Sequence, residues 1–315
     1  MPLKGKGFDR MDDEVTYTAS MDGKIEMQND RIVVLPVHEV SGNAELAEGN
    51  IDFRGDIVIH GNVESGVSIR ATGSITIDGV AEACMLEAGK DIILRGGMLG
   101  GNKASVKTKG AITAKFFEFT NILCEGDLQA DVLMDCSVIC HGQIRLTGRK
   151  GSIIGGKVQA IRGLIATSLG NDAEKRTEIF VGAGIDVYSR LRVMEKKIEM
   201  TREELAKIEE GLEKFEILSK ERGVSYTNDP RRTSLLRIKI KDSAMLASDE
   251  EEVRKLRILA ESSRGACVSV IQEIYPGVII NMDELKLALK NMATGVEFYK
   301  LPDKIGTRPC SAGVE

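Results

Sequence analysis

The chain of 315 residues is long enough for two structural units. Its 33 glycines, the absence of tryptophan and an aromatic content of 4% favour an interior of small and aliphatic side chains. A net charge of −5 without a dense Lys/Arg block argues against a nucleic-acid partner. There is no apolar signal core, no membrane-spanning apolar run, and no disulfide-framework spacing among the six cysteines. The sequence therefore predicts a cytoplasmic protein without membrane insertion.

Residues 1–42 contain short β-rich runs, at 16–19 and 31–35, and we interpret them as an N-terminal β segment that leads into a repeat. From about residue 43, glycine followed by alternating aliphatic residues recurs at a near-constant distance. Gly110, Gly126 and Gly142 are 16 residues apart, as are Gly73 and Gly89. The step from Gly89 to Gly110 is longer and absorbs a glycine-rich insertion. The pattern predicts a single-stranded parallel β-helix over residues 43–186, a solenoid with coils of about 16 residues.

The repeat can be checked by stacking equivalent positions of successive coils. Two residues after the anchor glycines lie Ile75, Ile112, Leu128 and Ile144. Further along the coil, Ile122 should lie over Val138 and Cys124 over Cys140. All of these are apolar, as the inside of a narrow solenoid requires. The alternative, an ordinary β-sandwich, would show hairpin turns but no constant period.

Residues 187–265 change to a helical period and predict an antiparallel coiled-coil hairpin. Gly223 is placed to end the first helix, Asp229 to cap the second, and Pro230 to begin it. Ser248 and Glu251 have the spacing of residues that cap a helix, so the sequence leaves open whether a new helix begins there within the second helical segment. The first seam comprises Leu191, Met194, Ile198, Thr201, Leu205, Ile208, Leu212 and Phe215; the second comprises Leu235, Ile238, Met245, Val253, Leu256 and Ala260.

The β pattern resumes over residues 266–315, with runs at 267–271, 277–280 and 295–299. Residues 285–289 alternate as well, although they also fit a turn of helix. The fold class that we predict is therefore mostly β, a solenoid interrupted by the helical hairpin. The returning segment should add a final coil or a lid.

These residues resemble the flagellar assembly protein A family, a bacterial family long catalogued as a domain of unknown function. The resemblance rests on residues 49–53, 150–156 and 275–278, and on the order of β-repeat, coiled coil and β-return. It implies a cytoplasmic scaffold linked to flagellar assembly and cell-pole organisation, without established catalysis. No functional residue carries over from it.

Three patterns suggest more specific chemistry, and each has a simpler explanation. Residues 151–158 nearly match a phosphate-binding loop, but Val158 replaces the magnesium ligand and a strand pattern follows instead of a helix. Cys136, Cys140 and His141 resemble metal ligands, yet His141 should lie on the opposite face of the strand. We interpret the two cysteines as small core residues.

The third pattern concerns enzymes, since His38, His60 and His141 are potential bases. Acyltransferase solenoids repeat every six residues, unlike this chain, and Asp127, Asp131 and Asp135 do not form a lyase-like cluster. We therefore predict no catalytic, cofactor-binding or metal-binding residue. The predicted function is a non-enzymatic scaffold that binds proteins and forms a homo-oligomer, a dimer with an interface above about 1,000 Å². A β-helical enzyme acting on a sugar or acyl donor is the alternative.

Overall fold

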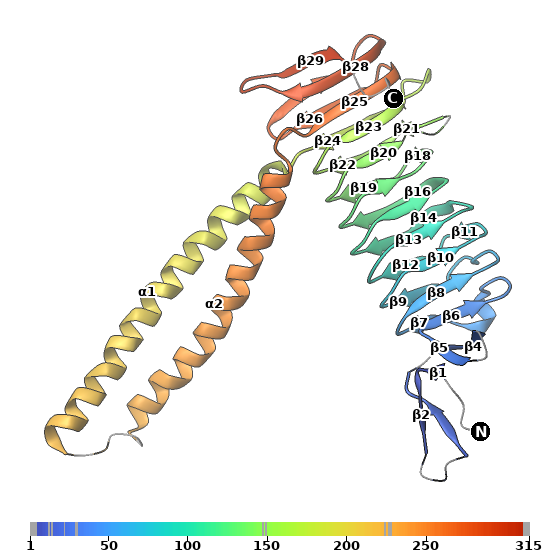
Figure 1. Ribbon diagram of the computed structural model, residues 1–315. Coiled ribbons are helices and arrows are strands. Elements are labelled where there is room, and N and C mark those ends of the chain that lie inside the picture. The colour runs from blue at the N-terminus through green and yellow to red at the C-terminus, as the bar shows by residue number, and fades with distance from the viewer. Residues whose placement is uncertain are drawn as a thin grey trace. The chain divides into compact units, whose positions relative to one another are not determined.

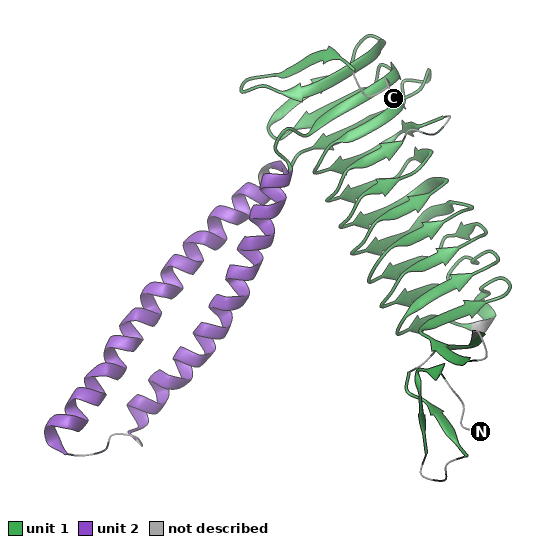
Figure 2. Cartoon of the chain, in the orientation of Figure 1, with its two compact units in different colours: residues 1–182, 263–315 green, residues 183–262 purple. Residues whose placement is uncertain are grey.

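The computed structural model describes residues 5–310 except 12, 14, 22, 29, 30, 147, 149, 224 and 226–228. The chain forms two compact units, one of residues 1–182 with 263–315 and one of residues 183–262 (Figure 2). The first unit is a stack of parallel strands, and the second is a pair of helices (Figure 1).

The stack has three ladders of parallel strands, because each coil contributes up to three short strands separated by corners. The first ladder consists of β6 (Val37–Val40), β8 (Asp56–Ile59), β10 (Ile75–Ile77), β13 (Ile92–Leu94), β15 (Ile112–Ala114), β17 (Leu128–Gln129), β20 (Ile144–Leu146), β23 (Leu164–Leu169) and β25 (Cys267–Ile274). The second consists of β7 (Ile51–Phe53), β9 (Ser68–Ala71), β12 (Met85–Ala88), β14 (Met98–Thr108), β16 (Phe116–Cys124), β19 (Ser137–Cys140), β22 (Gly156–Ala160), β24 (Thr177–Val181) and β26 (Val278–Met282). The third, shorter ladder joins β11 (Ala81–Glu82), the beginnings of β14 and β16, β18 (Val132–Met134), β21 (Ser152–Ile154) and the end of β23.

The core is a column of buried aliphatic side chains along the inside of these ladders. Ile75, Ile112, Leu128 and Ile144 are buried and belong to one ladder, and Cys124 pairs with Cys140. The predicted parallel solenoid and its inward register are therefore confirmed. This regular interior explains the composition, because only small and aliphatic side chains stack on copies of themselves in so narrow a space.

The length of the coils varies more than the spacing of the glycines predicted. Lys90, not Gly89, follows Gly73 in the corner ladder, since the Lys90 N–H donates to the Gly73 carbonyl at 3.0 Å. Ile92 accordingly pairs with Ile75, so this coil has 17 residues, whereas the coil from Ile112 to Leu128 has 16. The prediction that Gly89 marks the corner of this coil was wrong, because Lys90 occupies the corner position that glycine holds in other coils.

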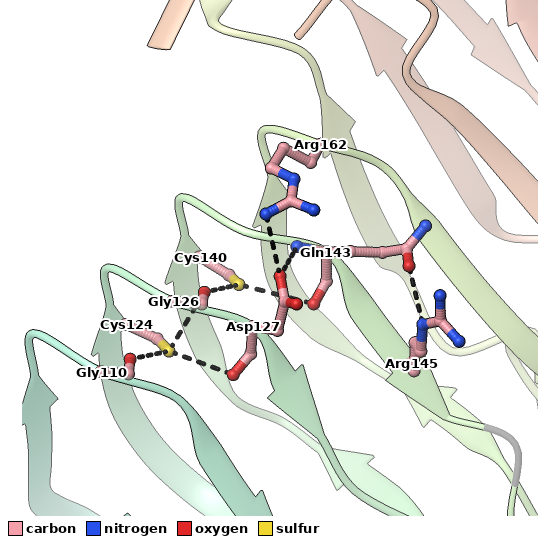
Figure 3. A network of polar contacts seen from close by, with 8 residues as sticks. All are labelled: Gly110, Cys124, Gly126, Asp127, Cys140, Gln143, Arg145 and Arg162. Atoms are coloured by element: carbon pink, nitrogen blue, oxygen red, sulfur yellow. Dashed lines mark hydrogen bonds and ion pairs between the residues drawn. The ribbon is translucent and has the colours of Figure 1, made fainter. Parts of the chain in front are cut away.

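An aspartate in one coil explains why the next coil needs glycine at the same corner (Figure 3). Asp127 Oδ1 accepts a hydrogen bond from the Gln143 N–H at 2.8 Å. A Cβ atom at Gly142 would lie 2.3 Å from the same carboxylate oxygen and 2.4 Å from the Gly126 carbonyl oxygen. The same contact recurs between Asp56 and the Ser74 N–H at 2.7 Å, and between Asp91 and the Ala111 N–H at 2.7 Å.

The strand direction reverses at the C-terminal end of the stack. β27 (Leu285–Ala288) pairs antiparallel with β26, β28 (Ala293–Lys300) with β25, and β29 (Ile305–Pro309) with β28. The buried Glu297 carboxylate of β28 accepts hydrogen bonds from Ser269 Oγ at 3.1 Å and from Arg308 Nε at 2.7 Å. The returning chain therefore adds both a last parallel coil and a lid, and residues 285–288 form a strand.

The N-terminal segment forms two small sheets within the first unit. β1 (Gly5–Lys6), β5 (Arg31–Leu35) and β4 (Lys24–Gln28) make one, and β2 (Phe8–Arg10) with β3 (Tyr17–Ala19) makes the other. A short 3₁₀ helix, η1 (Leu46–Glu48), lies at a corner of the first coil.

The second unit is an antiparallel pair of helices, α1 (Gly184–Arg222) and α2 (Pro230–Ser262). Ion pairs join the two helices in antiparallel order. Arg257 near the end of α2 pairs with Glu195 near the start of α1, and Lys239 in the first half of α2 pairs with Glu209 in the second half of α1. Asp229 Oδ1 caps α2 by accepting from the Arg231 N–H at 2.8 Å, and Gly223 ends α1 in the left-handed conformation. α2 is continuous, so no helix restarts at Ser248.

The seam of α1 agrees with the prediction, whereas that of α2 differs in part. Every predicted α1 seam residue is buried or half-buried, but Ile238 and Met245 of α2 are exposed. Lys239 and Asp249 lie toward α1 instead, where Asp249 Oδ2 is 2.7 Å from Lys197 Nζ. The charged groups are accommodated because each finds an ionic partner on the other helix.

We predict that the inward register decides the effect of substitutions in β15 and its flank. Ile112→Asp should destabilise the fold by several kcal/mol, because Ile112 is buried and the new charge would have no partner. Lys115→Asp should change stability by about 0.5 kcal/mol or less, because Lys115 is exposed. Chemical denaturation of the two variants measures this difference, and equal midpoints would contradict the assigned register.

A second prediction concerns the corner glycines. Gly142→Ala should destabilise by roughly 1–3 kcal/mol, because its Cβ atom would overlap Asp127 and the Gly126 backbone. Gly42→Ala is the matched control, since nothing lies within 4 Å of a Cβ atom at Gly42. Thermal melting of both variants tests the corner argument, which fails if they melt together.

Candidate interaction surfaces

The glycine-rich segment at residues 151–158 is a corner between two strands. Residues 152–154 form β21 and residues 156–160 form β22, so no helix N-terminus follows the glycines. Gly155 and Gly156 both have φ near +70°, at 72° and 75°, a conformation that only glycine adopts easily. The segment lacks the amide cradle of a phosphate loop, and the predicted corner is confirmed.

The cysteines near this corner are core residues. Cys124 and Cys140 stack in successive coils, and both thiols lie near backbone carbonyl oxygens, with Cys140 Sγ 3.2 Å from the Gly126 oxygen (Figure 3). The hydrogen bond to Cys124 and burial raise the pKa of Cys140, and burial raises the pKa of Cys136 to about 11. The thiols of Cys136 and Cys140 are thereby kept protonated, and protonated, buried thiols are poor nucleophiles and poor metal ligands. The hydrogen bond with Cys140 lowers the pKa of Cys124, which is buried as well. Among the described residues, no group of three or more His, Cys, Asp or Glu side chains is placed to hold a metal ion.

The three aspartates of one coil occupy three different corners. Asp127 precedes β17, Asp131 lies between β17 and β18, and Asp135 lies between β18 and β19. Asp127 accepts the corner hydrogen bond described above and lies 3.6 Å from Arg162, while Asp135 pairs with Lys175. The carboxylates therefore serve neighbouring coils and do not converge into the cluster that a β-helix lyase needs.

His60 lies at the centre of a chain of charged groups that crosses several coils. Its Nε2 atom is 2.8 Å from Glu39 Oε1, and its Nδ1 atom is 2.9 Å from Asp78 Oδ2. Lys24 pairs with Glu39 at one end, and Arg95 Nε lies 3.3 Å from Asp78 Oδ1 at the other. Strand register aligns His60, Asp78 and Arg95 in successive coils, whereas Glu39 lies two residues off this register and Lys24 belongs to another sheet, so the sequence did not predict this chain.

This arrangement favours the protonated form of His60. Hydrogen bonds to Glu39 and then to Asp78 raise the pKa of His60. Both ring nitrogens lie within hydrogen-bond distance of carboxylates, an arrangement that suits a structural role better than a general base. Of the other histidines, His38 lies against the ring of Phe53, with ring centroids 5.5 Å apart.

The second unit carries an open groove of about 1030 Å³ along one side of its two helices. Ile198 and Val253 form its buried floor, and Ile258, which is 57% exposed, lies at its edge. The remaining lining is charged: Glu195, Glu199, Arg202 and Glu203 from α1, and Glu250, Arg254, Arg257 and Glu261 from α2.

Three carboxylates of the groove form no ion pair with the residues that the structure describes. Glu195 pairs with Arg257 and Glu250 with Arg202. In the described part of the chain, Glu199, Glu203 and Glu261 form no ion pair. The groove thus combines an apolar floor with unpaired negative charge, and the sequence prediction of an apolar seam did not identify it.

The stacked ladders and the helical insertion define this protein as a parallel β-solenoid with a coiled-coil hairpin. The family description "Flagellar Assembly Protein A beta solenoid domain" matches residues 36–305, and the chain belongs to this family. No curated protein and no solved structure matches the chain. Among the described residues, no helix is long and apolar enough to cross a membrane.

We predict that His60→Gln lowers the melting temperature at pH 5 to 6 and has less effect at higher pH. A histidine with a raised folded-state pKa contributes stability that is complete below its unfolded pKa of about 6.5 and is lost as the pH rises through the folded pKa. Melting curves of both proteins across this range test the sign. His38→Gln is the control, and a loss that grows with pH would contradict the charge chain.

Proposed function

We propose that the chain acts in flagellar assembly as a non-enzymatic scaffold in the cytoplasm, binding proteins and forming a homo-oligomer. The family implies the flagellar connection. The scaffold role is supported by one observation in particular: the side chains with the most reactive chemistry are occupied in holding coils together. His60 bridges two carboxylates, and Cys124 and Cys140 are buried in a ladder.

We also propose that the four predicted segments have separate roles. Residues 1–42 lead into the stack, 43–186 form the rigid body, 187–265 provide a helical surface for partners, and 266–315 close the stack. A solenoid suits a scaffold because its outward positions form straight ladders at a fixed spacing of roughly 4.8 Å.

The proposal predicts that flagellar assembly needs the fold but not the histidines. Cells deleted for this gene should be defective in flagellar number or placement. A variant with His38, His60 and His141 all changed to glutamine should restore assembly at near wild-type expression, whereas Ile112→Asp should not. Electron microscopy of flagella, with immunoblots for protein level, measures both.

One result of this experiment would contradict the scaffold role. If the triple glutamine variant accumulates normally and still fails to restore flagella, a chemical role for a histidine replaces the proposal. Normal flagella in the deletion strain would remove the link to flagellar assembly.

A further inference from the structure

The helix α2 carries a second apolar stripe in addition to its seam with α1. Ile240 and Ile258 are 71% and 57% exposed, and they are 18 residues apart, which is five turns of an α-helix. Ala247 lies between them at steps of seven and eleven residues, on the same side and exposed. Because Ile258 lines the groove, this stripe, which Glu251 and Arg254 interrupt, borders the groove.

The charges of α2 are divided between its two halves. Its first half contains five basic residues and one acidic residue: Arg231, Arg232, Arg237, Lys239, Lys241 and Asp242. The second half contains five acidic residues and three basic residues: Asp249, Glu250, Glu251, Glu252, Glu261, Arg254, Lys255 and Arg257. In the described part of the chain, Arg232, Arg237 and Lys241 form no ion pair, so three free cations complement the three free groove carboxylates.

We propose that the groove binds the first half of α2 from a second copy of this chain, with the two α2 helices antiparallel. This orientation places the basic half of each helix on the acidic groove of the other copy. A parallel pair would set the two basic first halves against each other. The contact is reciprocal, so two copies form a closed two-fold dimer with two identical groove contacts.

The middle of α2 allows this approach. Ser243, Ala244, Ala247 and Ser248 are all exposed and small, so two helix backbones can come close there. A crossing centred near Ala244 places Ile240 against Ala247 of the partner subunit. The same register sets Arg237 against Glu250 of the partner subunit, a charged residue of the groove lining.

This inference rests on the homo-oligomer of the proposed function and names its interface, and it does not depend on a flagellar role. The intact chain should sediment as a dimer at low salt, and the dimer should weaken as ionic strength rises, since exposed charges are screened. Two charge-reversed variants test the contact: Glu199→Lys with Glu203→Lys in the groove, and Arg232→Glu with Arg237→Glu in the first half of α2.

Each variant alone should weaken dimerisation at least about tenfold, because it sets like charges together at both contacts. An equimolar mixture of the two variants should dimerise again, because each reversed groove then meets a reversed helix. Glu204→Lys is the control: it neighbours Glu203, is exposed and lies outside the groove lining, so it should dimerise as the wild type does. Circular dichroism establishes that every variant is folded.

Three results would overturn the inference. The first is a wild-type monomer at high micromolar concentration. The second is a dimer that neither reversal weakens, which would move the interface to the solenoid. The third is a folded mixture of the two variants that stays monomeric. Loss of flagellar function without change in mass would count against the scaffold proposal and leave the dimer intact.

Discussion

Hydrogen bonding between successive coils, in register and in parallel, is the constraint on which the rest of this structure depends. Each residue of a ladder lies over its equivalent in the next coil, so the interior must be filled by side chains that stack on their own kind. Ile75, Ile92 and Ile112 are buried for this reason. At the corners the same constraint brings backbones and carboxylates together, and only glycine fits above Asp127.

The outward side chains stack in the same ladders, so the same register decides which charged side chains lie next to each other. Neighbouring coils are close enough for Arg70 to meet both Asp52, at 3.5 Å, and Glu87, at 3.0 Å. Alternating signs along such a ladder avoid the repulsion that stacked like charges would cause. The C-terminal end must also be closed, because an open strand edge invites pairing with other chains. The antiparallel lid of β27, β28 and β29 accomplishes this, with Glu297 bonded to Ser269 and Arg308.

The sequence predicted most of the fold because periodicity is a property of backbone geometry. Alternation with glycine corners identified the solenoid, and steps of three and four identified α1. Prediction was weaker where tertiary contacts decide between similar patterns. Lys90 occupies a glycine-like corner, and α2 places Lys239 and Asp249 toward α1 while Ile238 stays exposed. The His60 chain needs the exact coil lengths, and the groove depends on the rotation of α2, which hydrophobicity alone does not fix.

The most direct test of the account is a measurement of distance along one outward ladder. Thr76, Arg145 and Ile165 lie on the same ladder, with Arg145 four coils and Ile165 five coils from Thr76. Spin labels at Thr76 and Arg145 should be separated by about 19 Å, and labels at Thr76 and Ile165 by about 24 Å, at 4.8 Å per coil. A shorter distance for the second pair than for the first would contradict the stacked register.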